Sequence, residues 1–454
     1  MRIKIEEELR HLDLGDKRRN ERLGTIIEQI VSQPGMSIPQ LGYSWSDTKM
    51  TYHFYNNDKV SEDEVSKCVQ KATVDRCLQA PIVLSIQDTT SANFNSSAAG
   101  LGYLDHGMGE GLMVHNTLAV DEQGCPLGML YQKIWARDKS EMGKKKTRQQ
   151  RAIKDKESYR WLESMHKVDD LLKEEDSLKD RPKIIHIADR EADIYELFSE
   201  PRSANSELLI RCSHDRKTLL GNSMWQEIES EAVLATFELE LPNSNSETVR
   251  KVQMEVKSGM VLLSPPKDKR GLPALMVYGL LVREVNATEK GLEWRIITTM
   301  PATIAEQALT FVRWYSYRWR IERFHYILKS GCRLEDLQLR NVKALRKAVV
   351  VYSLSAFKLM QLLYQARINP DQPCTTYLEK EEWQLLVSVH SKSPVVSRET
   401  PTLQQCVIMI ARLGGYLARN NDGPPGIKNL WRGLQQLNAM VKAINLKNQW
   451  FSTF

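Results

Sequence analysis

KIIHIADREADIYELF, residues 183–198, is followed after residues 199–206 by ELLIRC, residues 207–212. Both runs contain apolar segments of strand length, and EADIYELF between them has the spacing of a short helix. Upstream lie another buried-type strand, IVLSIQD at 82–88, and two strand-like runs, VHNTLAV at 114–120 and LGMLYQKIW at 127–135. The intervening DEQGCP has turn-forming residues and predicts a hairpin.

A long charged stretch at about 150–174 predicts a helix between this hairpin and the strand at 183. The elements therefore follow the order strand, hairpin, helix, strand, helix and strand. This order predicts a mixed α/β fold with a ribonuclease H-like core. Residues from about 213 to 300 are strand-like, so we expect an inserted β subdomain there. A strong helix at about 304–329 should follow the insertion, and the core as a whole should span residues 76–370.

Helical segments flank this core. At the N-terminus, residues 1–75 contain DKRRNERLGTIIEQIVSQ at 16–33, with apolar residues at helical spacing and Pro34 and Gly35 at its end. At the C-terminus, NPDQPC at 369–374 suggests a linker, and residues 371–454 look helical. Within that tail, apolar residues repeat at spacings of four and three: Leu430, Leu434, Leu437, Val441 and Ile444. This seam suits either helix pairing or an ordinary core face.

The composition is that of a globular protein, and it excludes few classes of protein. The chain has 454 residues, of which 42% are hydrophobic and 26% are charged, so we expect two or three structural units. Seven cysteines are scattered without a CxxC pair, which favours neither a zinc site nor a disulfide framework. Without an apolar signal region or membrane-length apolar run, we expect a soluble protein of the bacterial cytoplasm, associated with the nucleoid and not with a membrane.

The distribution of charge points toward nucleic acid more than the net charge of +6 does. Residues 313–347 contain ten Lys or Arg against three acids, a local excess of seven positive charges. A second basic run, KKKTRQQR at 144–151, is equally compatible with a solvated loop. Clustered basic side chains are the usual footprint of a phosphate backbone.

Two aspartates stand at the ends of predicted strands. Asp88 closes IVLSIQD, and Asp189 closes KIIHIAD. Ligands commonly gather at the carboxyl ends of such strands, so neighbouring strands would place both acids in one pocket. A single acid at a strand end is usually only a turn or cap residue. Neither aspartate is therefore assigned by its position alone.

A third acid lies among cations on the helix expected at 304–329. Tyr315, Arg318, Glu322 and Lys329 are offset by 0, 3, 7 and 14 residues. At about 100° per residue they fall at roughly 0°, 300°, 340° and 320°, one narrow stripe. The stripe fits a salt-bridged surface helix. It also fits phosphodiester chemistry, in which carboxylates hold Mg²⁺ and cations hold the DNA phosphates.

The strings IQDTT at 86–90, ADREADIYE at 188–196 and YSYRWRIERFHYILKSG at 315–331 resemble the catalytic motifs of one enzyme family. They are similar to those of DDE transposases of the insertion-sequence-four family, transposon-five type. The stripe matches that family's Y-x2-R-x3-E-x6-K signature without a gap. LGDKRRNERL at 14–23 and IARLGGYL at 410–417 also resemble the family, so the likeness spans nearly the whole chain.

The resemblance implies a cut-and-paste DNA transposase with Asp88, Asp189 and Glu322 as catalytic metal ligands. It implies two Mg²⁺ ions per active site, with Mn²⁺ tolerated. Three side chains of the signature would contact transposon-end phosphates: Tyr315, Arg318 and Lys329.

The inserted β subdomain carries further residues that the resemblance assigns to DNA. Trp294 would stack on a base flipped from the end of the DNA, with Arg211 nearby, although by itself Trp294 fits a core tryptophan. Ser213 departs from the family, in which a basic residue can follow this arginine.

The flanking segments would then bind DNA ends and a second copy of the chain. The N-terminal module would read the end sequence, using the basic face that contains Arg18, Arg19 and Arg22. The C-terminal helices would pair two chains, so that a homodimer bridges two transposon ends and joins them to double-stranded target DNA. A catalytically inactive end-binding regulator and a metal nuclease that does not join strands are the alternatives.

Four further polar residues remain without a specific role. Glu191 and Asp193 follow Asp189 at the start of a helix, where acids are favoured anyway, and are expected to support the site or the fold. His115 and His186 lie on predicted strands, where a histidine is more often structural than a ligand.

Overall fold

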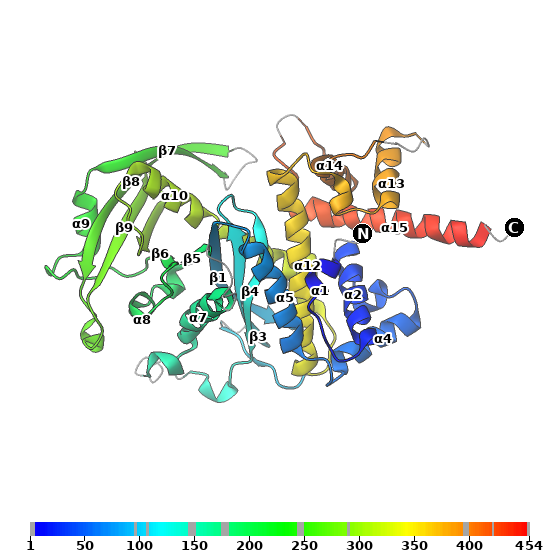
Figure 1. Cartoon of the computed structure of the whole chain (residues 1–454), viewed down its shortest axis with the longest axis horizontal. Coiled ribbons are helices and arrows are strands. Elements are labelled where there is room, and N and C mark those ends of the chain that lie inside the picture. The colour runs from blue at the N-terminus through cyan, green and yellow to red at the C-terminus, as the bar shows by residue number, and fades with distance from the viewer. Residues whose placement is uncertain are drawn as a thin grey trace.

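A wide sheet and one long helix organise the computed structural model (Figure 1). The structure describes residues 5–94, 98–105, 109–143, 151–173, 181–242, 249–287, 291–393, 399–419 and 422–451. β7, β8 and β9 form one end of the molecule, and the N- and C-terminal helices lie together at the other. Among the described residues, no helix is both long enough and apolar enough to cross a membrane.

The central sheet has ten strands and a mixed topology. Its order is β2-β3-β1-β5-β6-β10-β9-β8-β7, with β4 paired to β3. β1 (Ile82–Asn93), β5 (Lys183–Ala188) and β6 (Ser206–Arg211) are parallel neighbours. β3 (Glu110–Asp121) and β4 (Pro126–Trp135) form the expected hairpin, and β2 (Gly102–Tyr103) pairs with β3. The mixed α/β core expected from the order of elements is therefore confirmed.

The strands between residues 213 and 300 extend this sheet. β10 (Glu293–Thr298) pairs antiparallel with β6, and β9 (Leu275–Glu284), β8 (Val249–Leu263) and β7 (Val233–Pro242) continue outward from it. A short helix, α9 (Met224–Ser230), packs against β8 and β9. Its two turns are too short to give a clear helical period, which explains why the sequence pattern predicted strands alone.

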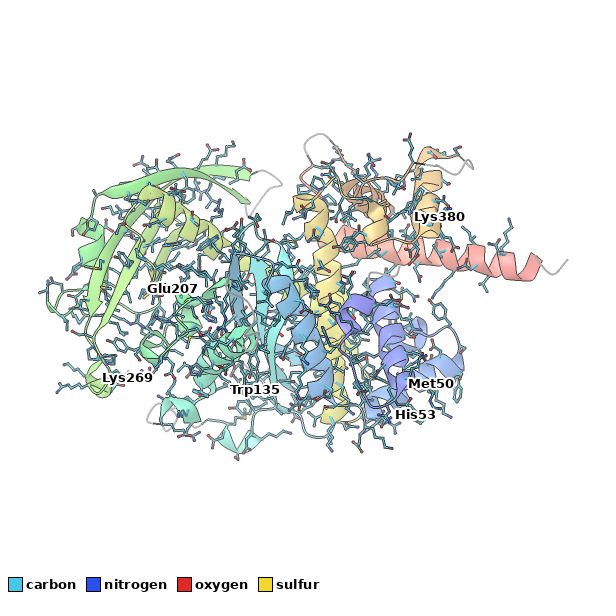
Figure 2. The ribbon with its side chains drawn as sticks, in the orientation of Figure 1. Met50, His53, Trp135, Glu207, Lys269 and Lys380 are labelled. Atoms are coloured by element: carbon cyan, nitrogen blue, oxygen red, sulfur yellow. The ribbon has the colours of Figure 1, made fainter. Side chains whose placement is uncertain are left out.

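In the described residues of the N-terminal module, five helices are formed: α1 (Ile5–Leu9), α2 (Lys17–Ser32), α3 (Ile38–Leu41), α4 (Trp45–Asn56) and α5 (Glu62–Cys77). The helix expected at 16–33 is α2, whose N-terminus is capped by the Asp16 side chain. Its periodic apolar residues, among them Leu23 and Ile27, are fully buried. Met50 and His53 of α4 lie at the outer surface of this module (Figure 2).

Two helices cover the sheet near its parallel strands, and both are shorter than expected. The predicted helix at about 150–174 begins as 3₁₀ turns, and α7 itself spans Arg160–Lys173. After β5, the chain makes a 3₁₀ turn at Arg190–Ala192 and then α8 (Tyr195–Ser199).

The helix expected as one piece at 304–329 is divided. α10 (Ala305–Ser316) ends in a turn at Tyr317 and Arg318, where backbone N–H groups bond three residues back. α11 (Trp319–Tyr326) follows and continues into a π-helical turn at Ile327–Gly331. A stripe drawn at a uniform 100° per residue therefore does not describe this segment exactly.

α12 (Val342–Ile368) runs through the middle of the molecule and is buried over most of its length. It is followed by α13 (Lys380–Ser391), α14 (Leu403–Leu413) and α15 (Ile427–Phe451). The expected linker after α12 is packed, because Cys374 is completely buried. One hydrophobic cluster contains residues from Ile5 to Leu437, so the N-terminal, central and C-terminal segments share a core.

The apolar seam of α15 divides into two parts. Leu430, Leu434 and Leu437 are buried against the rest of this chain, mainly α14. Val441 is half-buried, whereas the Ile444 side chain is exposed. The core-face interpretation therefore holds for the first three residues, and the far end of the helix remains accessible to a partner.

Candidate active site

Asp88 and Asp189 come from adjacent parallel strands. The register pairs Ile86 of β1 with Ile187 of β5, and each aspartate lies two residues farther along the chain. Asp189 directly follows β5, as expected. Asp88 does not end its strand: β1 continues to Asn93 because β3 pairs with it along that whole length. The two carboxylates thus meet where β5 stops and β1 goes on.

Backbone groups hold one oxygen of each aspartate. Asp88 Oδ1 accepts from the Thr89 N–H at 2.8 Å, and Asp189 Oδ1 accepts from the Glu191 N–H at 2.9 Å. Burial raises the pKa of Asp88 to about 7, and the charges of Asp189 and Glu322 act in the same direction. Negative charge at this position is therefore not fully neutralised by the surrounding side chains.

Glu322 approaches the aspartates from the first turn of α11. Its carboxylate is paired with the Arg318 guanidinium, which is itself largely buried. In the described part of the chain, no three acidic, histidine or cysteine side chains form a ready-made metal cluster. The donor set nevertheless suits a divalent cation, since it consists of hard carboxylate oxygens with excess negative charge. Release of Glu322 from Arg318 would free its oxygens for the same pocket.

Tyr315 and Trp294 lie deeper than the other members of the predicted site. Tyr315 is 2% exposed and Trp294 9% exposed, and their rings meet edge to face with centroids 5.8 Å apart. Within the part of the chain that the structure describes, the Tyr315 hydroxyl has no well-formed hydrogen bond, and the charges of Arg318 and Arg211 act on it. In this structure Trp294 is a core residue of β10, the alternative that its sequence context allowed.

Lys329 and Arg211 make contacts within the chain. Lys329 donates to the Ser91 carbonyl at 2.9 Å and pairs with Glu335 at 3.2 Å, which ties the π-helical turn to the far end of β1. Arg211 ends β6 and makes a long contact of 3.4 Å with the Glu293 carbonyl. Ser213 lies close by, and its N–H donates to Asp193 at 2.7 Å.

A buried arginine that sequence reasoning missed connects β1 beside Asp88 with the turn after Asp189. Arg160 donates to the Thr89 hydroxyl at 2.8 Å and to the Glu191 carboxylate at 2.6 Å. Thr89 in turn contacts His115 Nδ1 at 2.9 Å. Arg160 is the first residue of α7, a position that the helix dipole disfavours for a cation. The sequence placed Arg160 inside a helix expected from about residue 150, so no local pattern marked this position.

A second missed residue is His325, one helical turn after Glu322. Its Nδ1 lies 3.7 Å from Asp88 Oδ2, and its Nε2 lies 2.9 Å from Asn116 Nδ2 on β3. Burial lowers the pKa of His325 to about 3, and the positive charge of Lys329 adds to the effect. This pKa favours a neutral ring. In the sequence, the signal for His325 was its spacing of three residues from Glu322, which places both side chains on the same side of a helix.

Asp193 and His186 have structural surroundings. Asp193 pairs with Arg216 and accepts from two backbone N–H groups after β6. His186 is 1% exposed and contacts Asp169 at 3.2 Å and Ser206 at 3.0 Å. Both side chains hold neighbouring elements together, and neither is bonded to Asp88 or Asp189 within the described residues.

The three N-terminal arginines are unequally available. The Arg18 side chain is 89% exposed at the start of α2. Arg19 donates to the Leu14 carbonyl, and its side chain is 21% exposed. Arg22 is 15% exposed and is held by Asp47 and Thr51 of α4. Arg22 therefore fastens α2 to α4, and Arg18 is the arginine of this set that faces solvent most fully.

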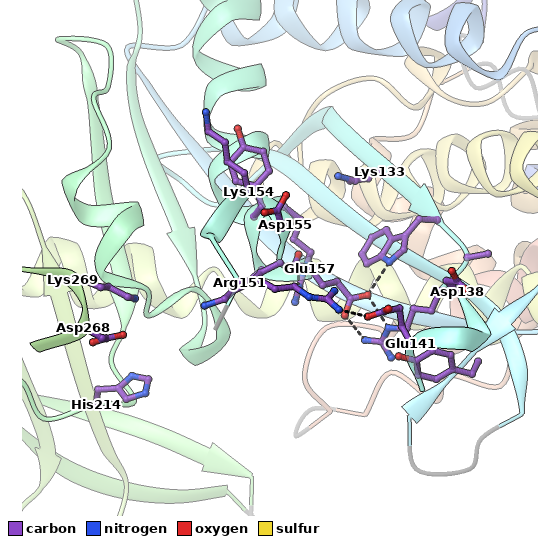
Figure 3. A pocket seen from close by; sticks show the side chains of 18 residues that line it. Lys133, Asp138, Glu141, Arg151, Lys154, Asp155, Glu157, His214, Asp268 and Lys269 are labelled. Atoms are coloured by element: carbon purple, nitrogen blue, oxygen red, sulfur yellow. Dashed lines mark hydrogen bonds and ion pairs between the residues drawn. The ribbon is translucent and has the colours of Figure 1, made fainter. Parts of the chain in front are cut away.

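A cavity of about 1070 Å³ lies beside Arg160. Lys269 and Asp268 from the β8–β9 connection lie across it from Lys154 and Arg151 (Figure 3). Seven Lys or Arg and five acids line it, and the cations are Lys133, Arg137, Arg151, Lys154, Lys156, Arg160 and Lys269. The basic run at 144–151 lies outside the described residues except for Arg151.

Comparisons with known proteins identify the family. Among solved structures, the piggyBac transposase synaptic complex with hairpin DNA matches 90% of this chain and 78% of that chain, at 8% identity and a TM-score of 0.38. Models of a transposase DNA-binding domain and of the Tn5 transposase dimerisation domain match residues 2–60 and 354–453. The model of the transposase DDE domain matches residues 103–357, more than half of the chain. The chain therefore belongs to the DDE transposases of the Tn5 type.

Proposed function

We propose that this transposase moves DNA by a cut-and-paste reaction at Asp88, Asp189 and Glu322. The observation that carries the proposal is the position of Asp88 and Asp189 on adjacent parallel strands, with Glu322 of α11 close enough for its charge to raise the pKa of Asp88. None of these side chains needs to act as a covalent nucleophile, because water and DNA hydroxyl groups supply the attacking oxygens. The established DNA transposase function is compatible with such a sequence of transfers.

The proposed steps are four phosphoryl transfers. Water attacks a phosphorus at the transposon end, and the 3′ oxygen of the DNA leaves as a hydroxyl. That hydroxyl attacks the opposite strand and forms a hairpin, which releases the flanking DNA. A second water opens the hairpin, and the restored 3′ hydroxyl attacks target DNA. Each transfer forms one phosphorus–oxygen bond and breaks another.

DDE transposase domains use divalent metal ions. In this chain we propose two Mg²⁺ ions, replaceable by Mn²⁺, with Asp88, Asp189 and Glu322 as the ligands. Such ions would stabilise charge on the attacking and leaving oxygens of each transfer. Arg318 would hold Glu322 before DNA binds and contact a phosphate afterwards, because its guanidinium can bind either anion. Tyr315, Lys329 and Arg211 would also contact the transposon-end DNA, and Trp294 would need to leave its core contact in order to stack on a flipped base.

The cavity beside Arg160 suits a DNA strand leaving this site. Arg160 borders the cavity and also contacts Thr89, next to Asp88. Lys154 and Lys156 add positive charge to its wall, and Tyr103, Trp135 and Tyr159 add aromatic surface on which bases can stack.

A synaptic homodimer completes the proposal. The exposed Ile444 and Leu446 side chains near the end of α15 would contact a second copy, while residues 1–75 bind the transposon end. A dimer would bring two ends to one double-stranded target.

One assay separates this function from its two alternatives. The protein is incubated with its end DNA, Mg²⁺ and a supercoiled target, and the products are resolved on denaturing gels. Nicks, hairpins and joined products are expected. End binding without nicks would favour the inactive regulator, and nicks without joined products would favour a nuclease.

Arg18 and Arg22 provide a matched test of end binding. Arg18→Ala should weaken binding of end DNA and reduce the slope of log affinity against log salt by about 1, because one phosphate contact is lost. Arg22→Ala should instead lower the thermal midpoint, since Arg22 joins α2 to α4. Fluorescence anisotropy at several salt concentrations, with thermal melts of both variants, measures the difference. An unchanged salt slope for Arg18→Ala would remove this residue from the proposed DNA contacts.

A further inference from the structure

A chain of polar side chains leads from α12 to Asp88. Ser353 on α12 contacts Gln132 on β4 at 2.8 Å, and Gln132 contacts Asn116 on β3 at 2.7 Å. Asn116 contacts His325 Nε2 at 2.9 Å, and His325 Nδ1 faces Asp88 at 3.7 Å. Four elements thus contribute one side chain each to a hydrogen-bonded path from Ser353 to His325, and the His325 ring faces Asp88.

The hydrogen bonds along this path have a direction. Gln132 uses its Nε2 group to donate to both Ser353 Oγ and Asn116 Oδ1. The Asn116 amide therefore presents its own Nδ2 donor to His325. An amide nitrogen cannot accept, so His325 Nε2 must be the unprotonated acceptor. In a neutral ring the proton then lies on Nδ1, and the N–H points toward Asp88.

If the hydrogen bonds ran in the opposite direction, every group from Ser353 to His325 would still have a partner. The two directions differ only at the contact between His325 and Asp88. If both amides were rotated, Gln132 would accept from Asn116, and Asn116 would accept from a protonated His325 Nε2. His325 Nδ1 would then present a lone pair to Asp88, and this contact is repulsive when Asp88 is ionised, the state that its proposed role as a metal ligand requires. Amide oxygen and nitrogen exchange freely in such networks, so this end contact decides between the two directions.

The buried position of Asn116 also indicates that its amide has a role beyond packing. Asn116 is 0% exposed on β3, between Val114 and Leu118, which face the same side of the strand and are fully buried. An apolar residue would fit this core without the cost of burying an amide. A fully bonded amide placed here fixes the orientation of the ring beside it.

We propose that Asn116 and Gln132 are positioning residues that set the His325 tautomer so that its Nδ1–H faces Asp88. At 3.7 Å the N–H and the Asp88 carboxylate are too far apart for a hydrogen bond, but the positive end of the N–H dipole would attract the ionised carboxylate and help to orient it. This inference rests on the proposed role of Asp88 in the reaction. It adds residues on β3 and β4 to the active site, at positions outside the Y-x2-R-x3-E-x6-K signature.

Nitrogen NMR of the ¹⁵N-histidine-labelled full-length protein tests the tautomer directly. Long-range ¹H–¹⁵N spectra distinguish Nδ1–H from Nε2–H rings, and His325→Gln identifies the His325 signal. The parent protein should show Nδ1–H. Gln132→Glu should convert the ring to Nε2–H without touching it, because a carboxylate can only accept and so rotates the Asn116 amide. Ser353→Ala should leave the Nδ1–H tautomer, since the Gln132–Asn116 bond remains.

The same variants show whether Gln132 positions the His325 ring for catalysis or only stabilises the fold. With an unchanged thermal midpoint, Gln132→Glu should slow strand cleavage about 10- to 100-fold, as for groups that orient ligands, whereas Ser353→Ala should cut normally. An Nε2–H ring in the parent, or an unconverted ring in Gln132→Glu, overturns the proposal. So does a converted ring with normal cleavage. The tautomer is read without turnover, so failure of the transposition assay would count against the proposed function and not against the tautomer assignment.

Discussion

Asp189→Asn should reduce strand cleavage about 10³-fold or more while leaving binding of end DNA nearly unchanged. A divalent cation stabilises the charge of the transition state by several kcal/mol, and loss of about 4 kcal/mol corresponds to about 10³-fold in rate. Asn retains the oxygen that accepts the Glu191 N–H, so the turn after β5 should keep its conformation. The change removes one negative charge and little else.

Glu191→Gln is the matched control, because it removes the same charge two residues away. The Glu191 side chain is 64% exposed and pairs with Arg160, so its loss should slow cleavage less than tenfold. Denaturing gels give the nicking rates, and anisotropy gives the end affinities. Equal cleavage by Asp189→Asn and the parent would show that Asp189 is not a ligand. A larger loss in Glu191→Gln than in Asp189→Asn would move the assignment to Glu191.

The sequence predicted those parts of the site that depend on local periodicity. KIIHIAD has the apolar pattern of a buried strand, and Asp189 follows that strand in the structure. The hairpin at 114–135 and α2 were likewise predicted from turn residues and helical spacing. The Asp88–Asp189 neighbourhood required a further step, the parallel pairing of β1 with β5, which the order of elements favoured.

Other features depend on long-range pairing that no local pattern contains. β1 continues past Asp88 because β3 lies beside it, and Trp294 is buried because Tyr315 packs against its ring. The division between α10 and α11 also interrupts a sequence whose helical period is continuous. His325 was recognisable only by its spacing of three residues from Glu322. No local pattern marked Arg160, because α7 begins later than the sequence predicted.

A buried ion triad joins α1, in the segment that matches the DNA-binding model, to α5 and to the part of α12 that matches the dimerisation model. Glu8 of α1 is 0% exposed and contacts Arg76 of α5 at 2.9 Å and Lys358 of α12 at 3.1 Å. Burial alone would raise the pKa of Glu8, but the charges of Lys358 and Arg76 lower it overall. The folded state therefore gains stability from this carboxylate above its ordinary pKa, and loses that stability as the pH falls through the depressed value.

Glu8→Ala should destabilise the protein by about 3–5 kcal/mol at neutral pH, because it leaves Lys358 buried at 3% exposure without its anion. Urea denaturation followed by tryptophan fluorescence measures the change. Glu64→Ala is the control: its pair with Lys67 on α5 is exposed and should contribute at most about 1 kcal/mol. Adding Lys358→Met to Glu8→Ala should restore part of the loss by removing the unpaired charge.

The pH dependence distinguishes an ion triad from simple packing. The difference in stability between the parent and Glu8→Ala should shrink as the pH is lowered below the ordinary glutamate range, because protonation of Glu8 removes its charge in the parent as well. A packing defect would give a difference that does not depend on pH. A loss no larger than that of Glu64→Ala would show that α1 does not depend on this triad. With the triad broken, the N-terminal module should loosen from α12 first, so end binding should fall at denaturant concentrations that leave the central sheet folded.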